Sequence, residues 1–195
     1  MSIAEKEKWQ EKYESISLLP NKSPASWLLE WASIIPRGKI MDLGIGLGAN
    51  ALYLASQGYS VFGIDISEKA IHAVRQTAFR KSLEVHLIVA DLDAFPIPAE
   101  SFDGVLSFFY LNRGLFPQIK KCLKPGGVLL METYVNDPSK EEGCQITHCL
   151  RQTELAGVFG DLEILSYAEG EAPCIKDMPQ TQSLGTARIC ARRVK

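Results

Sequence analysis

The sequence predicts an α/β fold: a doubly wound, mostly parallel seven-stranded sheet with an antiparallel hairpin near its C-terminal end. Short apolar runs alternate with segments of helical apolar spacing between residues 39 and 134. Strands joined through helices pair in parallel, with right-handed crossovers and helices on both faces. The last two apolar runs, 162–167 and 186–191, have no helix between them. We therefore expect these two strands to form the antiparallel hairpin at one edge.

The glycine-rich stretch 39–50 is expected to organise the sheet. Its apolar strand, 40–43, runs into glycines at 44, 46 and 48 and then into good helix formers from Ala49 to Ser56. Glycines allow a tight turn and the close approach of a ligand to the main chain. The free N–H groups at the start of the helix favour an anionic group. The stretch therefore predicts a cofactor site.

The first two helices are predicted from aromatic spacing and from a start signal. Trp9 and Tyr13 lie one helical turn apart in the polar segment 3–14, which indicates a short helix with one aromatic stripe. Ser23 and Pro24 have the residue types of an N-cap and first helical position, so we expect a second helix to begin there.

The remaining elements follow from periodicity and turn residues. Gly58 is expected to end the helix 49–56, and Ser67 to begin the next one, which runs to about residue 80. Further expected strands are 59–66, 85–89, 102–109 and 128–134, with a helix at 115–123, a sharp turn at 124–127 and a last helix from residue 153. The segments 135–149 and 169–183 are predicted to be irregular.

Composition and charge narrow the class of protein. The 195 residues, 46% apolar and 23% charged, suffice for one domain with a sizeable core. A net charge of −2 gives no basic surplus for binding nucleic acid, and no apolar run is long enough to span a membrane. The first eight residues lack the apolar centre of a signal peptide, so we expect a cytoplasmic protein. The five cysteines have no Cys-x-x-Cys spacing, which predicts free thiols and no metal site.

Acidic and aromatic residues mark one edge of the predicted sheet. Asp42, Asp65 and Asp91 come at or just after strand ends, as does the segment 107–110. Ligands of such sheets bind at the carboxyl ends of the strands, where the winding direction reverses. These residues are therefore expected to line one cleft.

The glycine motif by itself leaves two kinds of nucleoside cofactor open. With Ala49 in place of the third glycine it fits the dinucleotide pattern, and Asp65 is placed to bind a ribose, as in a nicotinamide-dependent oxidoreductase. Two features favour another reading. Asp42 stands where a dinucleotide site has apolar strand residues, and Asp91 and the run 123–127 (Leu-Lys-Pro-Gly-Gly) follow at later strands.

With these features, residues 37–134 resemble the class I, seven-stranded S-adenosylmethionine-dependent methyltransferases, whose sheet is Rossmann-like. The segment 42–48 resembles the first motif of that family, 89–92 its adenine-binding turn and 123–127 the turn before its fifth strand. The resemblance implies S-adenosylmethionine as cofactor. It further implies that the Asp65 carboxylate accepts hydrogen bonds from both ribose hydroxyls and that the Asp91 carboxylate accepts one from the adenine amino group. Asp42 is placed to hold water or the amino group of the cofactor.

A narrower resemblance extends over most of the chain. The segments 8–13, 49–55 and 110–113 resemble small methyltransferases of the tellurite-resistance and thiopurine groups. In that branch an N-terminal aromatic helix covers the cofactor. The expected organisation is a single domain, 1–195, with a helical cap (1–35), a cofactor-binding core (37–134) and a substrate-side loop with the C-terminal strands (135–195). The cofactor-binding residues expected on all these grounds are Asp42, Gly44, Gly46, Gly48, Asp65, Ile66, Asp91, Leu92, Phe108, Trp9 and Tyr13.

Candidates for the methyl acceptor side come from the end of the fourth strand and from the segment after the fifth. Phe108, Phe109 and Tyr110 place aromatic faces near the sulfonium and the acceptor, although neighbouring strand residues point to opposite faces, so one of the two phenylalanines is expected in the core. Arg113 is a candidate partner for an anionic acceptor and His148 for a general base, each weighed against a plain structural role. Tyr110, Arg113 and His148 are thus the catalytic candidates.

The resulting hypothesis is a methyltransferase acting on a small molecule, a thiol or a metalloid oxyanion among the options. No metal, nucleic acid or membrane is expected as a partner, and the oligomeric state is not predicted. Three alternatives stay open: a nicotinamide-dependent oxidoreductase, a catalytically silent S-adenosylmethionine-binding protein, and a methyltransferase acting on nucleic acid or protein.

Overall fold

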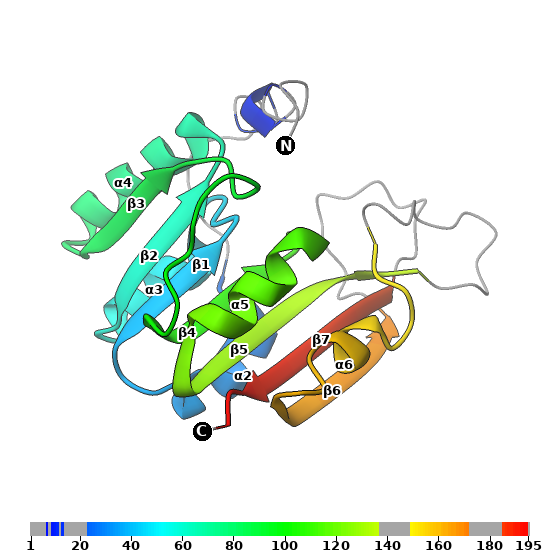
Figure 1. The fold of residues 1–195 in the computed structure, drawn as a ribbon. Helices are drawn as coiled ribbons and strands as arrows, with labels where there is room; N and C mark the ends of the chain where they lie inside the picture. The colour runs from blue at the N-terminus through cyan, green and yellow to red at the C-terminus, as the bar shows by residue number, and fades with distance from the viewer. Residues whose placement is uncertain are drawn as a thin grey trace.

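The computed structural model describes Glu7, Trp9, Gln10, Glu11 and Tyr13 and the ranges 23–136, 149–171 and 185–194. These residues form one twisted sheet with helices on both faces (Figure 1). The strands are β1 (Lys39–Leu43), β2 (Ser60–Asp65), β3 (Val85–Val89), β4 (Phe102–Phe108), β5 (Leu123–Val135), β6 (Glu163–Glu171) and β7 (Gly185–Arg192). The helices are α2 (Ser26–Trp31), α3 (Ala49–Ser56), α4 (Glu68–Arg80), α5 (Phe116–Cys122) and α6 (Glu154–Val158), with 3-10 turns η1 (Ala32–Ile34) and η2 (Arg113–Leu115).

The strand order is β3-β2-β1-β4-β5-β7-β6. The first five strands pair in parallel, whereas β7 is antiparallel to both β5 and β6. The predicted sheet and its antiparallel C-terminal pair are confirmed, and β7 lies between β5 and the edge strand β6. Since the order reverses between β1 and β4, the carboxyl ends of these two strands form the switch point at which such sheets bind ligands.

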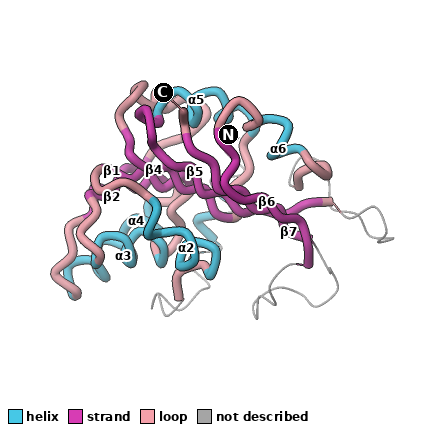
Figure 2. The backbone as a smooth tube through the Cα atoms, turned by 90° about the horizontal axis from the view of Figure 1, so that it is seen from below, coloured by secondary structure: helices cyan, strands magenta, loops and turns pink. Residues whose placement is uncertain are grey.

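The sheet is buried on both faces because its central strands are apolar on both sides. In β5, Leu129 and Met131 pack with α5 and α6, while Val128 and Leu130 pack with α2, α3 and α4. Figure 2 shows these two helix layers on opposite sides of the sheet. Asp42 lies in β1 and Asp65 at the end of β2. Both carboxyl groups are therefore held near the switch point by buried, well-packed strands.

Several boundaries differ from the sequence predictions. Helix α2 begins at Ser26, with Ala25 as N-cap and no side-chain cap, so the start expected at Ser23 and Pro24 is wrong. The N–H of Ala25 instead donates to Asn50 Oδ1 at 2.8 Å, which fixes this segment to the start of α3. The predicted N-cap Ser67 of α4 is confirmed, because its hydroxyl accepts the N–H of Ala70.

Two further expectations need correction. Strand β5 begins at Leu123, opposite Phe102, because the predicted turn at 124–127 is accommodated by a register shift between Phe102 and Gly104. Cys149 is disulfide-bonded, so free thiols are found only at the buried Cys122 and Cys190 among the cysteines that the structure describes. The irregular segments predicted around the substrate side fall largely outside the described residues.

Candidate active site

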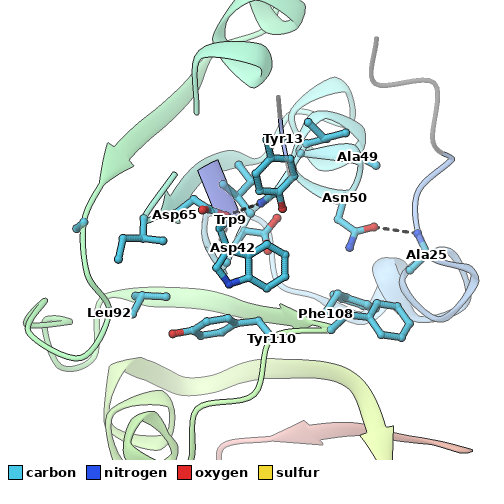
Figure 3. A pocket seen from close by; sticks show the side chains of 18 of the residues that line it. Trp9, Tyr13, Ala25, Asp42, Ala49, Asn50, Asp65, Leu92, Phe108 and Tyr110 are labelled. Carbon is cyan, nitrogen blue, oxygen red and sulfur yellow. Dashed lines mark hydrogen bonds between the residues drawn. The ribbon is translucent and has the colours of Figure 1, made fainter. Parts of the chain in front are cut away.

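A cavity of about 420 Å³ opens at the carboxyl ends of β1, β2 and β4 (Figure 3). Ten of the eleven expected cofactor-binding residues line it, all except Asp91, and so does Tyr110. Phe109, also named from the sequence, lines the cavity as well, and the lining is completed by residues not predicted there: Ser23, Ala25, Ile45, Leu47, Ala49, Asn50 and Ala90. The cavity therefore lies where the sequence placed the cleft, and it is bounded partly by residues from the segment before α2.

The three glycines of the turn have positive φ angles, 68° at Gly44, 53° at Gly46 and 74° at Gly48. This region is costly for any residue with a Cβ atom. Each glycine also leaves room for a neighbour. A Cβ at Gly44 would lie 2.8 Å from Tyr110 Cγ, one at Gly46 would lie 2.9 Å from the Tyr13 hydroxyl, and one at Gly48 would lie 2.8 Å from the side chain of Val74.

Asp65 joins the glycine turn to the start of α4. Its Oδ2 accepts the N–H of Gly46 and its Oδ1 accepts the N–H of Ser67, both at 2.9 Å. Burial raises the pKa of this carboxyl group above its ordinary value, while these backbone hydrogen bonds act in the opposite direction. Each carboxylate oxygen keeps a further lone pair for a ligand hydroxyl group.

Asp42 is a buried carboxyl group, 3% exposed, that no residue in the described ranges stabilises by a hydrogen bond. Burial raises its pKa to about 7, and the negative charge of Asp65 contributes in the same direction. A buried carboxylate of this kind gains most from a cation in the cavity. Asp42 and Asp65 thus make one wall of the cavity strongly attractive to a positively charged group.

Trp9 and Tyr13 cover this wall from the N-terminal side (Figure 3). Their rings are stacked, with centroids 6.0 Å apart and an interplanar angle of 26°. Burial and the charge of Asp65 raise the pKa of Tyr13. The expected aromatic pair is therefore at the cavity, and its role of covering the cofactor stays a prediction.

As expected for one of the two, Phe108 packs against the core, but Phe108 and Phe109 both line the cavity. The reason is a left-handed backbone at Phe109, with φ 54°, which ends the alternation of the strand. The N–H of Phe109 donates to the carbonyl oxygen of Glu132 at 2.7 Å, and its ring lies 5.1 Å from that of Tyr134. The aromatic residues themselves were predicted, but the approach of both phenylalanine rings to one cavity was not, because a positive φ at phenylalanine leaves no signal in the sequence.

Asp91 lies outside the residues that line the cavity. Its Oδ1 accepts the N–H of Asp93 at 2.9 Å, which forms a turn stabilised by the aspartate side chain. Its neighbours Ala90 and Leu92 do line the cavity. The role of Asp91 toward adenine therefore stays a prediction.

Arg113 also lies outside the cavity lining. Its Nε and one terminal nitrogen donate to the two carboxylate oxygens of Glu154, at 2.5 and 2.8 Å, and the terminal nitrogen also donates to the Cys149 carbonyl oxygen at 2.9 Å. The structure thus places Arg113 in a bidentate ion pair that joins η2 to α6, in place of the predicted approach to an acceptor. His148 and Cys144 fall outside the described residues.

Among the described residues, no group of three or more metal-ligating side chains occurs, and no helix is long and apolar enough to cross a membrane.

Comparison with known proteins agrees with this geometry. Residues 40–127 match the protein family described as Methyltransferase domain. The chain is 30% identical over 149 residues, 73% of its length, to a probable S-adenosyl-L-methionine-dependent methyltransferase, TehB of Haemophilus influenzae, and 30% identical over 130 residues to phosphoethanolamine N-methyltransferase 1 of Arabidopsis thaliana. These segments cover 52% and 26% of the two relatives, so the chain spans about half the length of the first and a quarter of the second.

The chain has the fold of the class I S-adenosylmethionine-dependent methyltransferases. Solved structures show the same fold. TehB of Haemophilus influenzae superposes with a TM-score of 0.76 at 22% identity, over 95% of this chain and 67% of that one. The geranyl diphosphate C-methyltransferase of Streptomyces coelicolor A3(2), solved with S-adenosylhomocysteine, superposes with a TM-score of 0.74 at 12% identity, over 97% of each chain.

The cavity has groups that suit S-adenosylmethionine, the cofactor named for the TehB relative. S-adenosylmethionine carries an ammonium group and a sulfonium group, and Asp42 is a buried carboxyl group to which no described residue donates a hydrogen bond. Asp65 has acceptor capacity left for hydroxyl groups, and the open N-terminus of α3 suits a carboxylate. Apolar Ile66 and Leu92 suit a flat base.

Proposed function

We propose that this protein transfers a methyl group from S-adenosylmethionine to a small-molecule acceptor in the described cavity. The observation that carries the proposal is the pair of buried carboxyl groups, Asp42 and Asp65, beside a glycine turn with three positive φ angles. Asp42 would hold the ammonium group of the cofactor and Asp65 its ribose hydroxyls. When bound, the cofactor supplies a methyl group activated by a positively charged sulfur.

The remaining task of the protein is alignment and exclusion of water, because the methyl group needs no further activation. Trp9 and Tyr13 would close the cavity over the cofactor. Phe108, Phe109 and Tyr110 would border the acceptor and present ring faces to positive charge. Burial raises the pKa of Tyr110 to about 12, so its hydroxyl stays protonated at neutral pH and can donate a hydrogen bond.

The acceptor is proposed to be a small molecule because the cavity has a volume of only about 420 Å³ and no basic surplus favours a nucleic acid. A thiol or a metalloid oxyanion, expected from the narrower resemblance, stays a prediction. A cytoplasmic location is likewise proposed from the sequence. His148 stays a candidate base, whereas Arg113 is proposed to position α6 against η2.

Titration calorimetry with S-adenosylmethionine, S-adenosylhomocysteine and NAD tests the cofactor assignment. We expect both sulfur nucleosides to bind with one site per chain and NAD to give no heat of binding. NAD binding without a response to S-adenosylhomocysteine would support the oxidoreductase instead. If S-adenosylmethionine binds but labelled methyl groups reach no acceptor in a screen of thiols, oxyanions, amines, heteroaromatic bases and phenols, the silent binding protein would be supported.

A further inference from the structure

The aromatic side of the cavity is held by an unusual backbone. Phe109 is one of four non-glycine residues with positive φ in the described ranges, and the one that lines the cavity. This conformation is strained for a residue with a side chain as large as phenylalanine. The hydrogen bond from its N–H to Glu132 and the ring contact with Tyr134 hold the conformation. The strained turn places two successive rings, Phe108 and Phe109, at the same cavity.

The turn also positions the next aromatic residue. The Ser107 hydroxyl donates to the Tyr110 carbonyl oxygen at 3.0 Å, and the Tyr110 ring packs directly against Gly44. Figure 3 shows Phe108 and Tyr110 on the same side of the cavity, facing Asp42 and Trp9. Phe108, Phe109 and Tyr110 are called the aromatic wall below.

The charges around the cavity have one sign. None of the described residues that line it is a lysine, arginine or histidine, whereas two are buried aspartates. Arg113, which the sequence suggested as the partner of an anionic acceptor, instead donates hydrogen bonds to the Glu154 carboxylate and to the Cys149 carbonyl oxygen. An anionic acceptor would therefore meet two carboxyl groups and the negative faces of aromatic rings, with no described cation to offset them.

We propose that the acceptor subsite at the aromatic wall binds an uncharged, flat molecule whose nucleophile is a lone pair without a proton to lose, a heteroaromatic ring nitrogen or an aryl thioether sulfur. This assignment rests on the proposed function and narrows it: a metalloid oxyanion or a thiolate is not the preferred acceptor. The rings stack on a flat molecule, and their negative faces then stabilise the cation that methylation produces.

The reaction of such an acceptor balances without a base. The bond between sulfonium sulfur and methyl carbon breaks with its electron pair left on that sulfur, and the acceptor lone pair forms the new bond to carbon. The positive charge passes to the acceptor, and no proton is released. The cavity lining agrees, because its described ionisable side chains are Asp42, Asp65, Tyr13 and Tyr110, of which the aspartates are assigned to the cofactor.

Binding can be tested without turnover. The full chain is saturated with S-adenosylhomocysteine, and quinoline, thioanisole, benzoate and selenite are titrated in turn, with binding followed by ligand-observed NMR for the organic probes and calorimetry for selenite. We expect quinoline or thioanisole to bind at least about tenfold more tightly than benzoate or selenite. Quinoline and thioanisole also distinguish ring nitrogen from thioether sulfur as the preferred nucleophile. Transfer from labelled S-adenosylmethionine should then yield the methylated cation of the better ligand.

Phe109→Leu tests the aromatic wall itself. Phe79→Leu is the control, since Phe79 lies on α4, is 85% exposed and is not among the lining residues. Phe109→Leu should lower the affinity for the better of the two neutral probes about tenfold and leave S-adenosylhomocysteine affinity within about twofold of the unsubstituted protein. Phe79→Leu should change neither affinity. Tighter binding of selenite or benzoate, or unchanged probe affinity in folded Phe109→Leu, would overturn the inference. Failure of S-adenosylhomocysteine itself to bind would instead overturn the proposed function.

Discussion

The two sides of the cavity are built by different means. On the cofactor side, the ends of β1 and β2 and the start of α3 present backbone groups, glycines and the carboxyl groups of Asp42 and Asp65. On the other side, the end of β4 presents the aromatic wall, with Tyr134 of β5 behind Phe109. Ligand binding on the first side depends on main-chain geometry and on carboxyl groups in fixed positions. Ligand binding on the second side depends on contacts with aromatic side chains, which can be substituted without changing the main chain of the glycine turn. The comparison predicts that substitutions on the two sides will separate cofactor binding from acceptor binding.

The largest effect is expected at Asp65. Asp65→Ala removes the acceptor for the N–H groups of Gly46 and Ser67 and the proposed contacts to the ribose. Affinity for S-adenosylhomocysteine should fall about 10- to 100-fold, since each lost charged hydrogen bond costs about 1–3 kcal/mol. Calorimetry measures the loss. Asp91→Ala is the matched control outside the cavity; an equal loss there would place the adenine contact at Asp91 as the resemblance implied.

Arg113 should affect stability more than ligand binding. Arg113→Ala leaves the Glu154 carboxylate, 14% exposed, without its bidentate partner. Urea unfolding should show a loss of about 1–2 kcal/mol, because charged hydrogen bonds with a mostly buried partner are lost. Arg192→Ala breaks a more exposed pair with Glu163 and should cost less. A loss of acceptor binding in Arg113→Ala with full stability would restore the predicted acceptor role.

Cofactor binding should depend on pH through Asp42. Its pKa is raised to about 7 in the folded protein, so between pH 4 and 7 the folded state holds a proton that the unfolded state releases. The contribution of this group to stability therefore falls as pH rises through that window.

An ammonium group beside Asp42 favours its charged form, so S-adenosylhomocysteine binding should release a proton at pH 6. Calorimetry in two buffers of different ionisation enthalpy should detect this release, and Asp42→Asn should abolish it.

The smallest effect is expected behind the aromatic wall, where two buried hydroxyl groups differ. The Thr186 hydroxyl, in a residue 1% exposed, has no hydrogen-bond partner among the residues that the structure describes, whereas the Ser107 hydroxyl donates to the Tyr110 carbonyl oxygen. Thr186→Val should leave the free energy of unfolding unchanged or raise it by less than about 1 kcal/mol, while Ser107→Ala should lower it by about 1 kcal/mol. Thermal and urea unfolding would show both. A marked loss in Thr186→Val would mean that its hydroxyl has a partner in solution.

On the cofactor side both the residues and their arrangement could be predicted from the sequence, whereas on the aromatic side the three residues were predicted but their arrangement was not, for a physical reason. Gly44, Gly46 and Gly48 are needed wherever a strand turns this tightly into a helix, and Asp65 follows at a fixed distance along a strand-helix-strand unit. Both are local in sequence. The opposite side depends on a left-handed backbone at Phe109 and on a contact across strands with Tyr134, and neither is encoded by a local pattern.

Arg113 and Asn50 illustrate the same limit. The engagement of Arg113 by Glu154 joins residues 41 positions apart, and the hydrogen bond from Ala25 to Asn50 joins residues 25 apart. Strand periodicity predicts neither pairing. Strand β3, by contrast, was predicted at its observed bounds, 85–89, because its apolar residues and flanking turns are contiguous.

The division of the cavity into two sides is tested most directly by measuring S-adenosylhomocysteine affinity in Asp65→Ala and Phe109→Leu side by side, with both variants shown to be folded. The account predicts a loss of about 10- to 100-fold in Asp65→Ala and a change within about twofold in Phe109→Leu. Equal losses in the two variants, or a larger loss in Phe109→Leu, would contradict it.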